Sequence, residues 1–254
     1  MKKHIRQLSA DGSQVQITFC DERYYLKHTM DPDGHILSTR EFPSVTWICN
    51  FVPKTIGYYR WLADKGWDEA EAIKEAAGDR GHKVHQAVSS LLLGNAVTIE
   101  DKFANSETGE LQELTIEEYE AVMSFVEWYK EVKPKMLVNE MVIWNEKENY
   151  AGTVDFICEI NGVRWLIDFK TSKEIYASHE CQLSAYKAAL PTELVPEKLA
   201  ILQLGYKKNK FKKWKFTEIE DQYDLFLSAQ NFWHKECDGM TVKKKDYPTS
   251  LSLQ

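Results

Sequence analysis

Two carboxylates and a lysine lie close together in the strongly apolar stretch 150–170. Asp155 falls in the run GTVDFICEI, and Asp168 and Lys170 fall in the next run, VRWLIDFK. Side chains at positions i and i+2 of a strand point to one face, so Asp168 and Lys170 are expected to point together. Asp155 and Asp168 lie equally far from Asn161-Gly162, a strong hairpin signal, so they are expected to be close to cross-strand partners.

Two facing carboxylates destabilise a sheet unless a cation lies between them. Mg²⁺ and Mn²⁺ take oxygen ligands from carboxylates, waters and phosphates. A lysine beside such an ion can orient or deprotonate an attacking water, or offset charge on a phosphate. Asp155, Asp168 and Lys170 therefore predict metal-assisted phosphodiester hydrolysis. The plainer interpretation is a surface ion pair between Asp168 and Lys170, but the apolar flanks and the opposing Asp155 count against it.

Three further titratable residues are weaker candidates. His85 precedes an apolar helical run and is a possible imidazole ligand, and His82, on roughly the same helix face, is its rival. A lone helical histidine is more often a core or surface residue. Glu140 alternates with Val138 and Val142, so the three are expected to share a strand face. An acid at that position is either solvent-facing or functional.

A helix that follows Lys170 presents Gln182 and Tyr186 at positions i and i+4, on one face. These two side chains are placed to hold a phosphate or to position Lys170. The alternative is the ordinary surface of an amphipathic helix.

Six lysines alternate with aromatic residues in the segment YKKNKFKKWKF at 206–216. Such a segment suits phosphate contacts combined with base stacking. The alternative is an edge strand whose lysines deter aggregation. We favour contact with DNA, because the chain is otherwise acidic, with a net charge of −7. The residues predicted to bind substrate in this way are Lys173, Lys210, Lys212 and Trp214.

The first half of the chain predicts a small β-rich region followed by helices. Residues 14–50 combine alternating apolar positions with turn signals. Gly66 and Gly94 are expected to end helices, and the segment Gly78 to Gly81 to interrupt the second of them. The remaining predictions for this half are a polar loop at 95–114 and an amphipathic helix capped by Thr115 and Glu118.

From residue 135 the pattern changes to strands. MLVNEMVIW, GTVDFICEI and VRWLIDFK are three successive runs rich in β-branched and aromatic residues. A helix over 175–190, strands in KLAILQLGY and KFKKWKFTEI, and a final helix in EDQYDLFLSAQNFWHKEC complete the chain. This order predicts an α/β fold of the α+β kind, with a mixed sheet flanked by helices. The regions expected within one compact unit are β-rich 1–53, helical 54–134, core 135–237 and tail 238–254.

Composition sets broad limits on the protein. Hydrophobic residues make up 43% of its 254 residues, which is enough for a sizeable core. The five cysteines are scattered and form no C-x-x-C pair, which argues against a disulfide framework or a zinc knuckle. No apolar run approaches the ~20 residues of a membrane span. We therefore expect a cytoplasmic protein without a membrane partner.

The sequence resembles the RecB-like exonuclease branch of the PD-(D/E)xK nuclease superfamily. It looks closest to small stand-alone members such as the single-strand exonucleases of phages and bacteria and the mitochondrial genome maintenance exonuclease. The resemblance covers roughly residues 43–190. The pieces that carry it, in the family's order, are PSVTWI (43–48), GHKVH (81–85), NEMVIW (139–144), YAGTVDFI (150–157), LIDFKTSK (166–173) and QLSAY (182–186).

The resemblance implies a restriction-endonuclease-like core with an N-terminal β and helical extension. It implies that His85, Asp155, Asp168 and the main-chain carbonyl of Phe169 bind Mg²⁺ or Mn²⁺, and that Lys170 is the catalytic lysine. Gln182 and Tyr186 match the motif after the core, and Glu140 matches an acidic position of variable role. It also favours His85 over His82, because His85 holds the matching position after Gly81.

Two departures from the family pattern are visible. Thr153-Val154 stand before Asp155, without the proline of the superfamily name. Some relatives carry an iron–sulfur cluster on cysteines near the C-terminus, but only Cys237 lies there, so we expect no cluster.

The expected function is a metal-dependent DNA exonuclease that prefers single strands or free ends, in repair, recombination or replication. The expected setting is the bacterial or phage-infected cytoplasm, at the nucleoid, with replication or recombination proteins as possible partners. The alternatives are a structure-selective endonuclease and a non-catalytic DNA-binding accessory protein.

Overall fold

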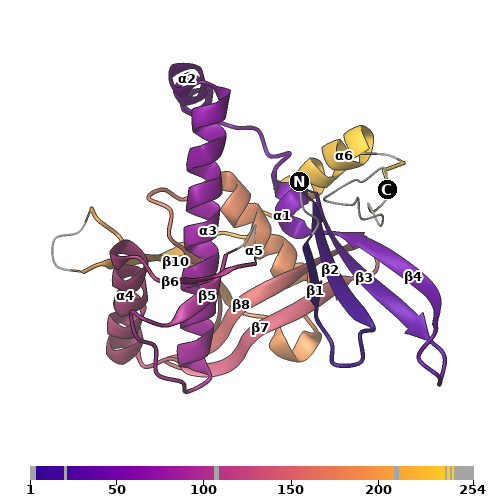
Figure 1. Ribbon diagram of the computed structural model, residues 1–254, viewed down its shortest axis with the longest axis horizontal. Helices are drawn as coiled ribbons and strands as arrows, with labels where there is room; N and C mark the ends of the chain where they lie inside the picture. The colour runs from indigo at the N-terminus through magenta and orange to yellow at the C-terminus, as the bar shows by residue number, and fades with distance from the viewer. Residues whose placement is uncertain are drawn as a thin grey trace, which may run out of the picture.

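A computed structural model describes residues 4–19, 22–105, 109–208, 212–237, 239–240 and 242. Two large sheets, a two-stranded sheet and a set of helices make up an α and β architecture in which the five-stranded sheet is mixed, which confirms the predicted class at that level. Figure 1 shows one sheet on the N-terminal side, the other among the central helices, and a long helix whose lower part crosses the second sheet while its upper end projects from the body. None of the described helices combines the length and hydropathy that a membrane crossing requires.

The N-terminal sheet is an antiparallel meander. Its strands follow chain order and are β1 (His4–Gln7), β2 (Gln14–Phe19), β3 (Glu22–Met30) and β4 (Ile36–Pro43). Helix α1 (Val45–Cys49) follows, and the Ser44 hydroxyl caps it by accepting a hydrogen bond from the N–H of Trp47 at 3.1 Å. The β-rich prediction for this region is confirmed, and PSVTWI forms a cap and a short helix.

The second sheet holds the residues with candidate chemistry. Its order is β11-β10-β9-β8-β7, with β9 and β10 parallel and all other neighbours antiparallel. Asn161 and Gly162 both have positive φ, 52° and 80°, as the predicted two-residue hairpin requires. The strands are β7 (Lys135–Asn145), β8 (Tyr150–Ile160), β9 (Val163–Lys170), β10 (Lys198–Leu204) and β11 (Trp214–Ile219).

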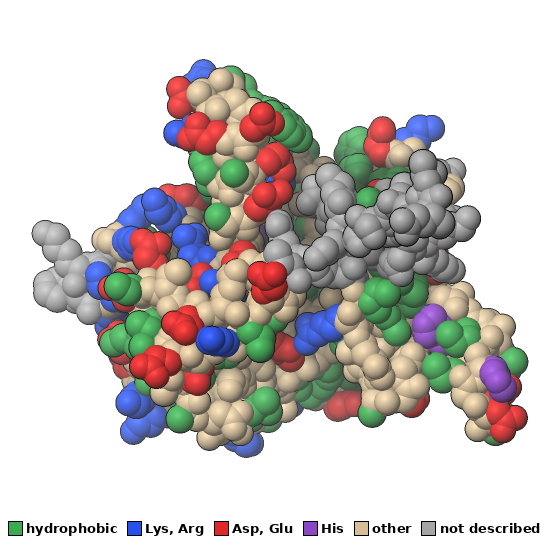
Figure 2. Space-filling model, in the orientation of Figure 1, with side chains coloured by type: hydrophobic (Ala, Val, Ile, Leu, Met, Phe, Trp, Pro, Cys, Tyr) green, Lys and Arg blue, Asp and Glu red, His purple; other side chains and the backbone are tan. Residues whose placement is uncertain are grey.

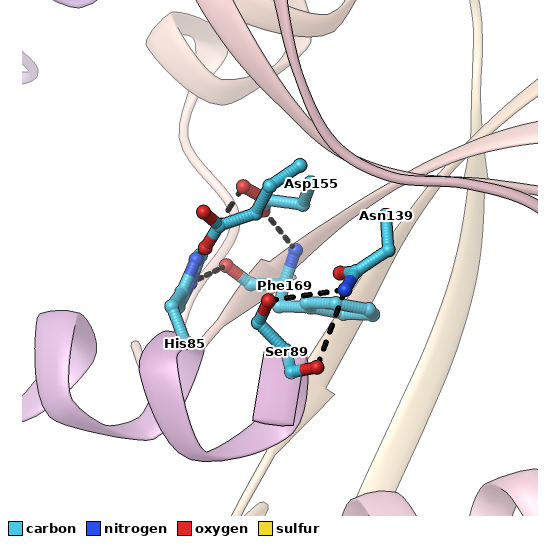
Figure 3. Close-up of a pocket in the computed structure, with 6 residues that line it drawn as sticks. His85, Ser89, Asn139, Asp155 and Phe169 are labelled. Atoms are coloured by element: carbon cyan, nitrogen blue, oxygen red, sulfur yellow. Dashed lines mark hydrogen bonds and ion pairs between the residues drawn. The ribbon is translucent and has the colours of Figure 1, made fainter. Parts of the chain in front are cut away.

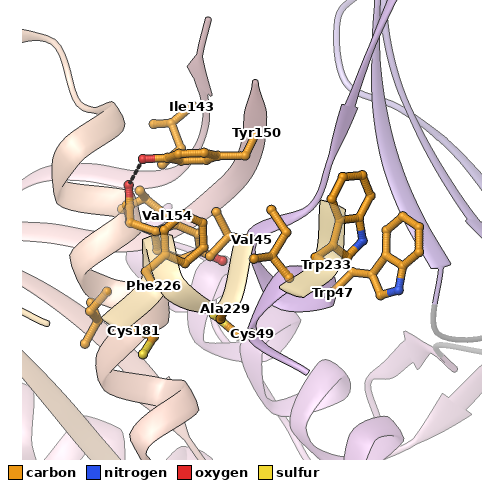
Figure 4. Packing of buried hydrophobic residues seen from close by; sticks show 14 of the residues in the cluster. Val45, Trp47, Cys49, Ile143, Tyr150, Val154, Cys181, Phe226, Ala229 and Trp233 are labelled. Carbon is orange, nitrogen blue, oxygen red and sulfur yellow. Dashed lines mark hydrogen bonds between the residues drawn. The ribbon is translucent and has the colours of Figure 1, made fainter. Parts of the chain in front are cut away.

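Helices cover both faces of this sheet. One buried cluster joins it to α1, α5 and α6, and Figure 4 shows Val45, Trp47 and Trp233 packed together in it. A second cluster joins the other face to α3 and α4. The helices are α2 (Ile56–Lys65), α3 (Trp67–Leu92), α4 (Ile116–Val132), α5 (Ala177–Ala189), a short 3₁₀ turn η1 (Thr192–Leu194) and α6 (Tyr223–Cys237).

Two predictions for the helical region are wrong. Helix α3 runs without a break through Gly78 and Gly81. Each glycine costs a helix only about 1 kcal/mol, and the buried face around Val84 outweighs that. The expected loop at 95–114 contains a hairpin. The Gln86 side chain holds this hairpin by donating to the carbonyl of Ala104 and accepting from its N–H. Its strands are β5 (Lys102–Ala104) and β6 (Leu111–Glu113).

The capping prediction for the next helix is confirmed. The Thr115 hydroxyl accepts from the N–H of Glu118, and the Glu118 carboxylate accepts from the N–H of Thr115 at 2.8 Å. Glu118 also binds the ammonium of Lys83 at 2.9 Å, although both side chains are buried. This ion pair ties α4 to α3 two residues before His85.

Candidate active site

Helix α3 and strands β8 and β9 meet around three predicted metal ligands. His85 Nε2 lies 2.8 Å from the main-chain oxygen of Phe169, and His85 Nδ1 lies 3.4 Å from Asp155 Oδ1. The N–H of Phe169 donates to Asp155 Oδ2 at 3.0 Å. Figure 3 shows these groups pointing toward one another, with His85 entering from the helix. The structure therefore brings the predicted imidazole, carboxylate and carbonyl together.

Electrostatics in this group favour an ion pair. Burial alone raises the pKa of Asp155, but the positive His85 and the Phe169 N–H lower it below its ordinary value. Burial alone lowers the pKa of His85, and the Asp155 carboxylate more than reverses that effect. A neutral imidazole is needed for metal ligation, so proton loss from His85 accompanies any binding at this site.

A second hydrogen-bonded group is formed by Asp168 and Lys170, the residues on either side of Phe169 in β9. Asp168 Oδ2 is 2.5 Å from the Lys170 ammonium, and Asp168 Oδ1 accepts from Gln182 Nε2 at 3.1 Å. Lys170 also donates to Gln182 Oε1 at 3.3 Å. Gln182 Nε2 reaches Tyr186 Oη at 3.0 Å. The prediction that Asp168 and Lys170 point to the same face is confirmed, and α5 brings Gln182 and Tyr186 to this group.

Asp168 is 2% exposed, and burial raises its pKa to about 6. Lys170 opposes this increase, and the charge of Asp155 adds to it. Asp168 Oδ2 accepts no hydrogen bond of good geometry among the described residues, despite the nearby ammonium. A buried carboxylate oxygen in that condition can still accept from a donor or bind a cation.

The register explains how the two acids are related. The β8–β9 ladder pairs Phe156 with Ile167 and stops there, one residue short of Asp155 and Asp168. The predicted cross-strand relationship holds in register, but each carboxylate has its own protein cation, His85 or Lys170. The repulsion that the sequence indicated is thus relieved in part by these two groups.

Strand β8 approaches α5 closely at Gly152. A Cβ added there would lie 2.4 Å from Cε1 of Tyr186, far inside van der Waals contact. Only glycine therefore leaves room for the ring, whose hydroxyl lies beside Gln182. Gly152 is a positioning residue that the sequence did not single out for this reason.

Glu140 lies on β7 with φ of +46°, a left-handed conformation that is strained for a non-glycine residue. It lines a shallow pocket between α3 and the sheet. Val138 and Val142 pack into different clusters, so the prediction that they share one face with Glu140 is wrong. The reason is that the left-handed residue breaks the strand's alternation. The pocket is lined by His85, Ser89, Asn139, Glu140, Asp155 and Phe169.

Sequence reasoning missed two polar residues of this pocket. Asn139 donates from Nδ2 to both the carbonyl and the hydroxyl of Ser89, at 3.2 and 3.0 Å. The contact joins β7 to α3 and is drawn in Figure 3. The sequence could have indicated Ser89, because it lies one helical turn after His85 and therefore on the same helix face.

The lysine segment gives a mixed result. Described lysines in it pair with acids: Lys207 with Glu117 at 2.6 Å, and Lys212 with Glu131 at 2.5 Å. Lys212 also lies over the Trp214 ring, on the edge strand β11. Figure 2 shows basic and acidic side chains beside one another on the face in view. Lys210 lies outside the described residues, and Lys173 is exposed in the loop between β9 and α5.

The donor set fits a hard divalent cation. Two carboxylates, a main-chain oxygen and an imidazole are ligand types that Mg²⁺ and, more favourably, Mn²⁺ accept. In this structure the ligand atoms of His85, Asp155 and Asp168 do not all lie within 4.8 Å of one another. Among the described residues, Asp31, Asp33 and His35 do meet that distance, but they lie on the exposed β3–β4 turn. That turn contributes nothing to the pocket.

Comparisons with known proteins add no assignment. No protein-family model matches the chain, and a search of curated proteins finds no match.

Proposed function

We propose that this protein is a metal-dependent nuclease that hydrolyses phosphodiester bonds in DNA, built on a restriction-endonuclease-like core. The observation that carries the proposal is the buried contact of Lys170 with Asp168 and Gln182, one residue away from the His85–Asp155–Phe169 group. A structural ion pair would not need a second, half-buried acid on the adjoining strand β8 or an imidazole that contacts both this acid and the Phe169 carbonyl. The mixed sheet with β9 parallel to β10 supports the proposed core.

The residues proposed to hold Mg²⁺ or Mn²⁺ are Asp155, Asp168, His85 and the Phe169 carbonyl. A bound ion would supply Lewis-acid polarisation of a phosphate oxygen and a lowered pKa for a bound water. To act as a ligand through Nε2, His85 would have to lose its Nε2 proton and its contact with the Phe169 carbonyl. Asp168, whose pKa is about 6, is largely ionised above neutral pH and adds its charge to the ligand set.

Lys170 is proposed to act on the attacking water or on the phosphate. Its ammonium is held by two acceptors, on β9 and α5, so it loses little conformational freedom when it donates a third hydrogen bond. Gln182 orients it, and Tyr186 orients Gln182. In this arrangement α5 sets the direction of the lysine.

Single-stranded DNA or DNA with free ends is the proposed substrate. Helix α3, which carries His85, continues N-terminally to α2 and forms with it an arm that leaves the body (Figure 1). Tyr59 and Trp67 are exposed on this arm, and Figure 2 shows hydrophobic side chains along it. Exposed aromatic rings suit base stacking. A structure-selective endonuclease is the second candidate, because the arm does not dictate whether an end is required.

The test uses end-labelled linear and covalently closed circular single-stranded DNA with Mg²⁺, Mn²⁺ or EDTA. Wild type is expected to degrade the linear strand only with metal and to spare the circle. Lys170→Ala should be inactive, whereas Lys187→Ala, which removes a surface lysine of α5 paired with Asp221, should remain active. Cutting of the circle would favour the endonuclease, and DNA binding without cleavage would favour an accessory protein.

A further inference from the structure

An arginine from the N-terminal sheet reaches the candidate site. Arg6 Nη2 on β1 donates to Glu140 Oε2 on β7 at 3.1 Å. Glu140 lines the same pocket as His85 and Asp155. All residues that the sequence predicted for the chemistry lie in the second half of the fold or on α3, so this contact comes from a part of the chain with no assigned role.

A second observation places positive charge near the same pocket. Burial, followed by the charges of His85, Arg6 and Arg23, lowers the pKa of His82 to about 4. His82 lies one helical turn before His85 on α3. The two arginines therefore stand near the helix face that carries the imidazole ligand.

The Arg6 contact is easily exchanged. Its side chain is 53% exposed, and exposed ion pairs contribute only about 0–1 kcal/mol. A guanidinium has five N–H donors in a fixed fork, which matches the oxygens of a phosphate. Charge-assisted pairs of this kind are stronger than neutral hydrogen bonds. Glu140 thus holds Arg6 at the pocket without occupying its whole donor set.

We propose that Arg6 is a phosphate-binding residue, which leaves Glu140 and takes a backbone phosphate of the nucleic-acid strand next to the scissile bond. The N-terminal sheet then forms one wall of the substrate site and Arg23 adds charge beside it. This inference rests on the proposed nuclease function. The Arg6 guanidinium would add positive charge at the pocket, which favours the approach of a polyanion.

A purely structural Arg6–Glu140 pair makes a different prediction. If the pair only fastened β1 to β7, loss of either partner would have the same effect. If Arg6 binds phosphate, Glu140→Gln removes a competitor and a negative charge, so it maintains or strengthens DNA binding, and Arg6→Ala weakens it.

Arg40→Ala is a matched control. Arg40 also lies in the N-terminal sheet, on β4, and also binds a carboxylate just beyond β7, Glu146, at 3.1 Å. Its side chain is similarly exposed. Neither Arg40 nor Glu146 lines the pocket.

The experiment measures fluorescence anisotropy of a short single-stranded oligonucleotide in the Lys170→Ala background with Mn²⁺, at several salt concentrations. Arg6→Ala is expected to raise Kd about fivefold to tenfold and to reduce the slope of log K against log salt by about 0.7, the value of one phosphate contact. Arg40→Ala should change neither quantity. Circular dichroism checks that each variant is folded.

Equal Kd values for Arg6→Ala and Arg40→Ala would overturn the inference but leave the nuclease proposal standing. Weakening by Glu140→Gln equal to that by Arg6→Ala would show a structural pair and would also overturn it. Failure of the wild type to cleave DNA, together with failure of the Lys170→Ala protein to bind it, would overturn both proposals.

Discussion

The imidazole of His85 and the main-chain oxygen of Phe169 face each other at 2.8 Å, across the boundary between α3 and β9. Both are candidate ligands, and in this structure each satisfies the other. For both groups to bind a metal ion, this hydrogen bond would have to break, and the energetic cost would include removal of the Nε2 proton of His85.

Metal binding should therefore stabilise the protein through His85. With Mn²⁺ at about 100 times Kd, the free energy of unfolding should rise by about 2.7 kcal/mol. Because Asp155 raises the pKa of His85, protons compete with the metal, so at one fixed Mn²⁺ concentration the increment should be larger at pH 8 than at pH 6. Thermal melts of wild type, His85→Ala and His82→Ala with and without Mn²⁺ are the measurement. Retention of the increment in His85→Ala would contradict the assignment.

The second prediction concerns stability against pH in EDTA. The folded pKa of Asp168, about 6, is above the unfolded value of 3.8. The folded state therefore holds the proton more tightly, and the protein loses stability relative to Asp168→Asn as pH rises through that window. The difference should grow by about 2 kcal/mol between pH 4 and pH 7. Urea unfolding of both proteins measures it, and a constant difference would refute the raised pKa.

Gly152→Ala should disturb the site from β8. The new methyl group overlaps the Tyr186 ring, so the ring must move and its contact with Gln182 is lost. Overpacking of this kind costs about 1–3 kcal/mol. Cleavage should also slow, because Gln182 then orients Lys170 poorly.

Gly78→Ala is the control for that substitution. Gly78 lies in α3 with open space where a Cβ would stand, so alanine should stabilise the helix by about 0.5–1 kcal/mol.

The double variant Gly152→Ala/Tyr186→Leu tests the role of Tyr186 in the Gly152 prediction. Restored activity in that variant would contradict a positioning role for Tyr186.

Removal of one partner from the buried pair of Lys83 and Glu118 should lower the free energy of unfolding substantially. Both side chains are 4% exposed, so Lys83→Met leaves an unpaired buried carboxylate, at a cost of about 3–5 kcal/mol. Lys83→Met with Glu118→Gln should recover most of that loss, since glutamine still serves the capping box at Thr115. Urea unfolding measures both variants. Lys65→Met, which breaks an exposed pair between Lys65 of α2 and Glu69 of α3, is the control and should cost under about 1 kcal/mol.

Local patterns predicted most of the second sheet because its signals are short-range. Asn161-Gly162 fixes the β8–β9 register by turn geometry, and that register brings Asp155 level with Asp168. Thr115 and Glu118 define a helix start through contacts three residues apart. Each feature depends on neighbours in sequence, which a single chain displays directly.

The parts that sequence reasoning missed depend on distant partners. Gln86 creates the β5–β6 anchor at Ala104, and Arg6 meets Glu140 from the far end of the chain. Glu140 itself takes a positive φ that no residue-type preference indicates. The role of Gly152 follows from a ring on another element. None of these relationships produces a periodic pattern in the amino-acid sequence.

The parallel pairing of β9 with β10 has a consequence for the order of folding. The β8–β9 hairpin closes through a two-residue turn, whereas β10 can join only after the chain has passed through α5. Gln182 lies on that connection, so Asp168 and Lys170 acquire their shared partner late, after the hairpin exists. Local opening of α5 would dismantle the site while the hairpin persists, and hydrogen exchange should show α5 amides opening before those of β8. Activity would then be lost in conditions milder than those that melt the sheet.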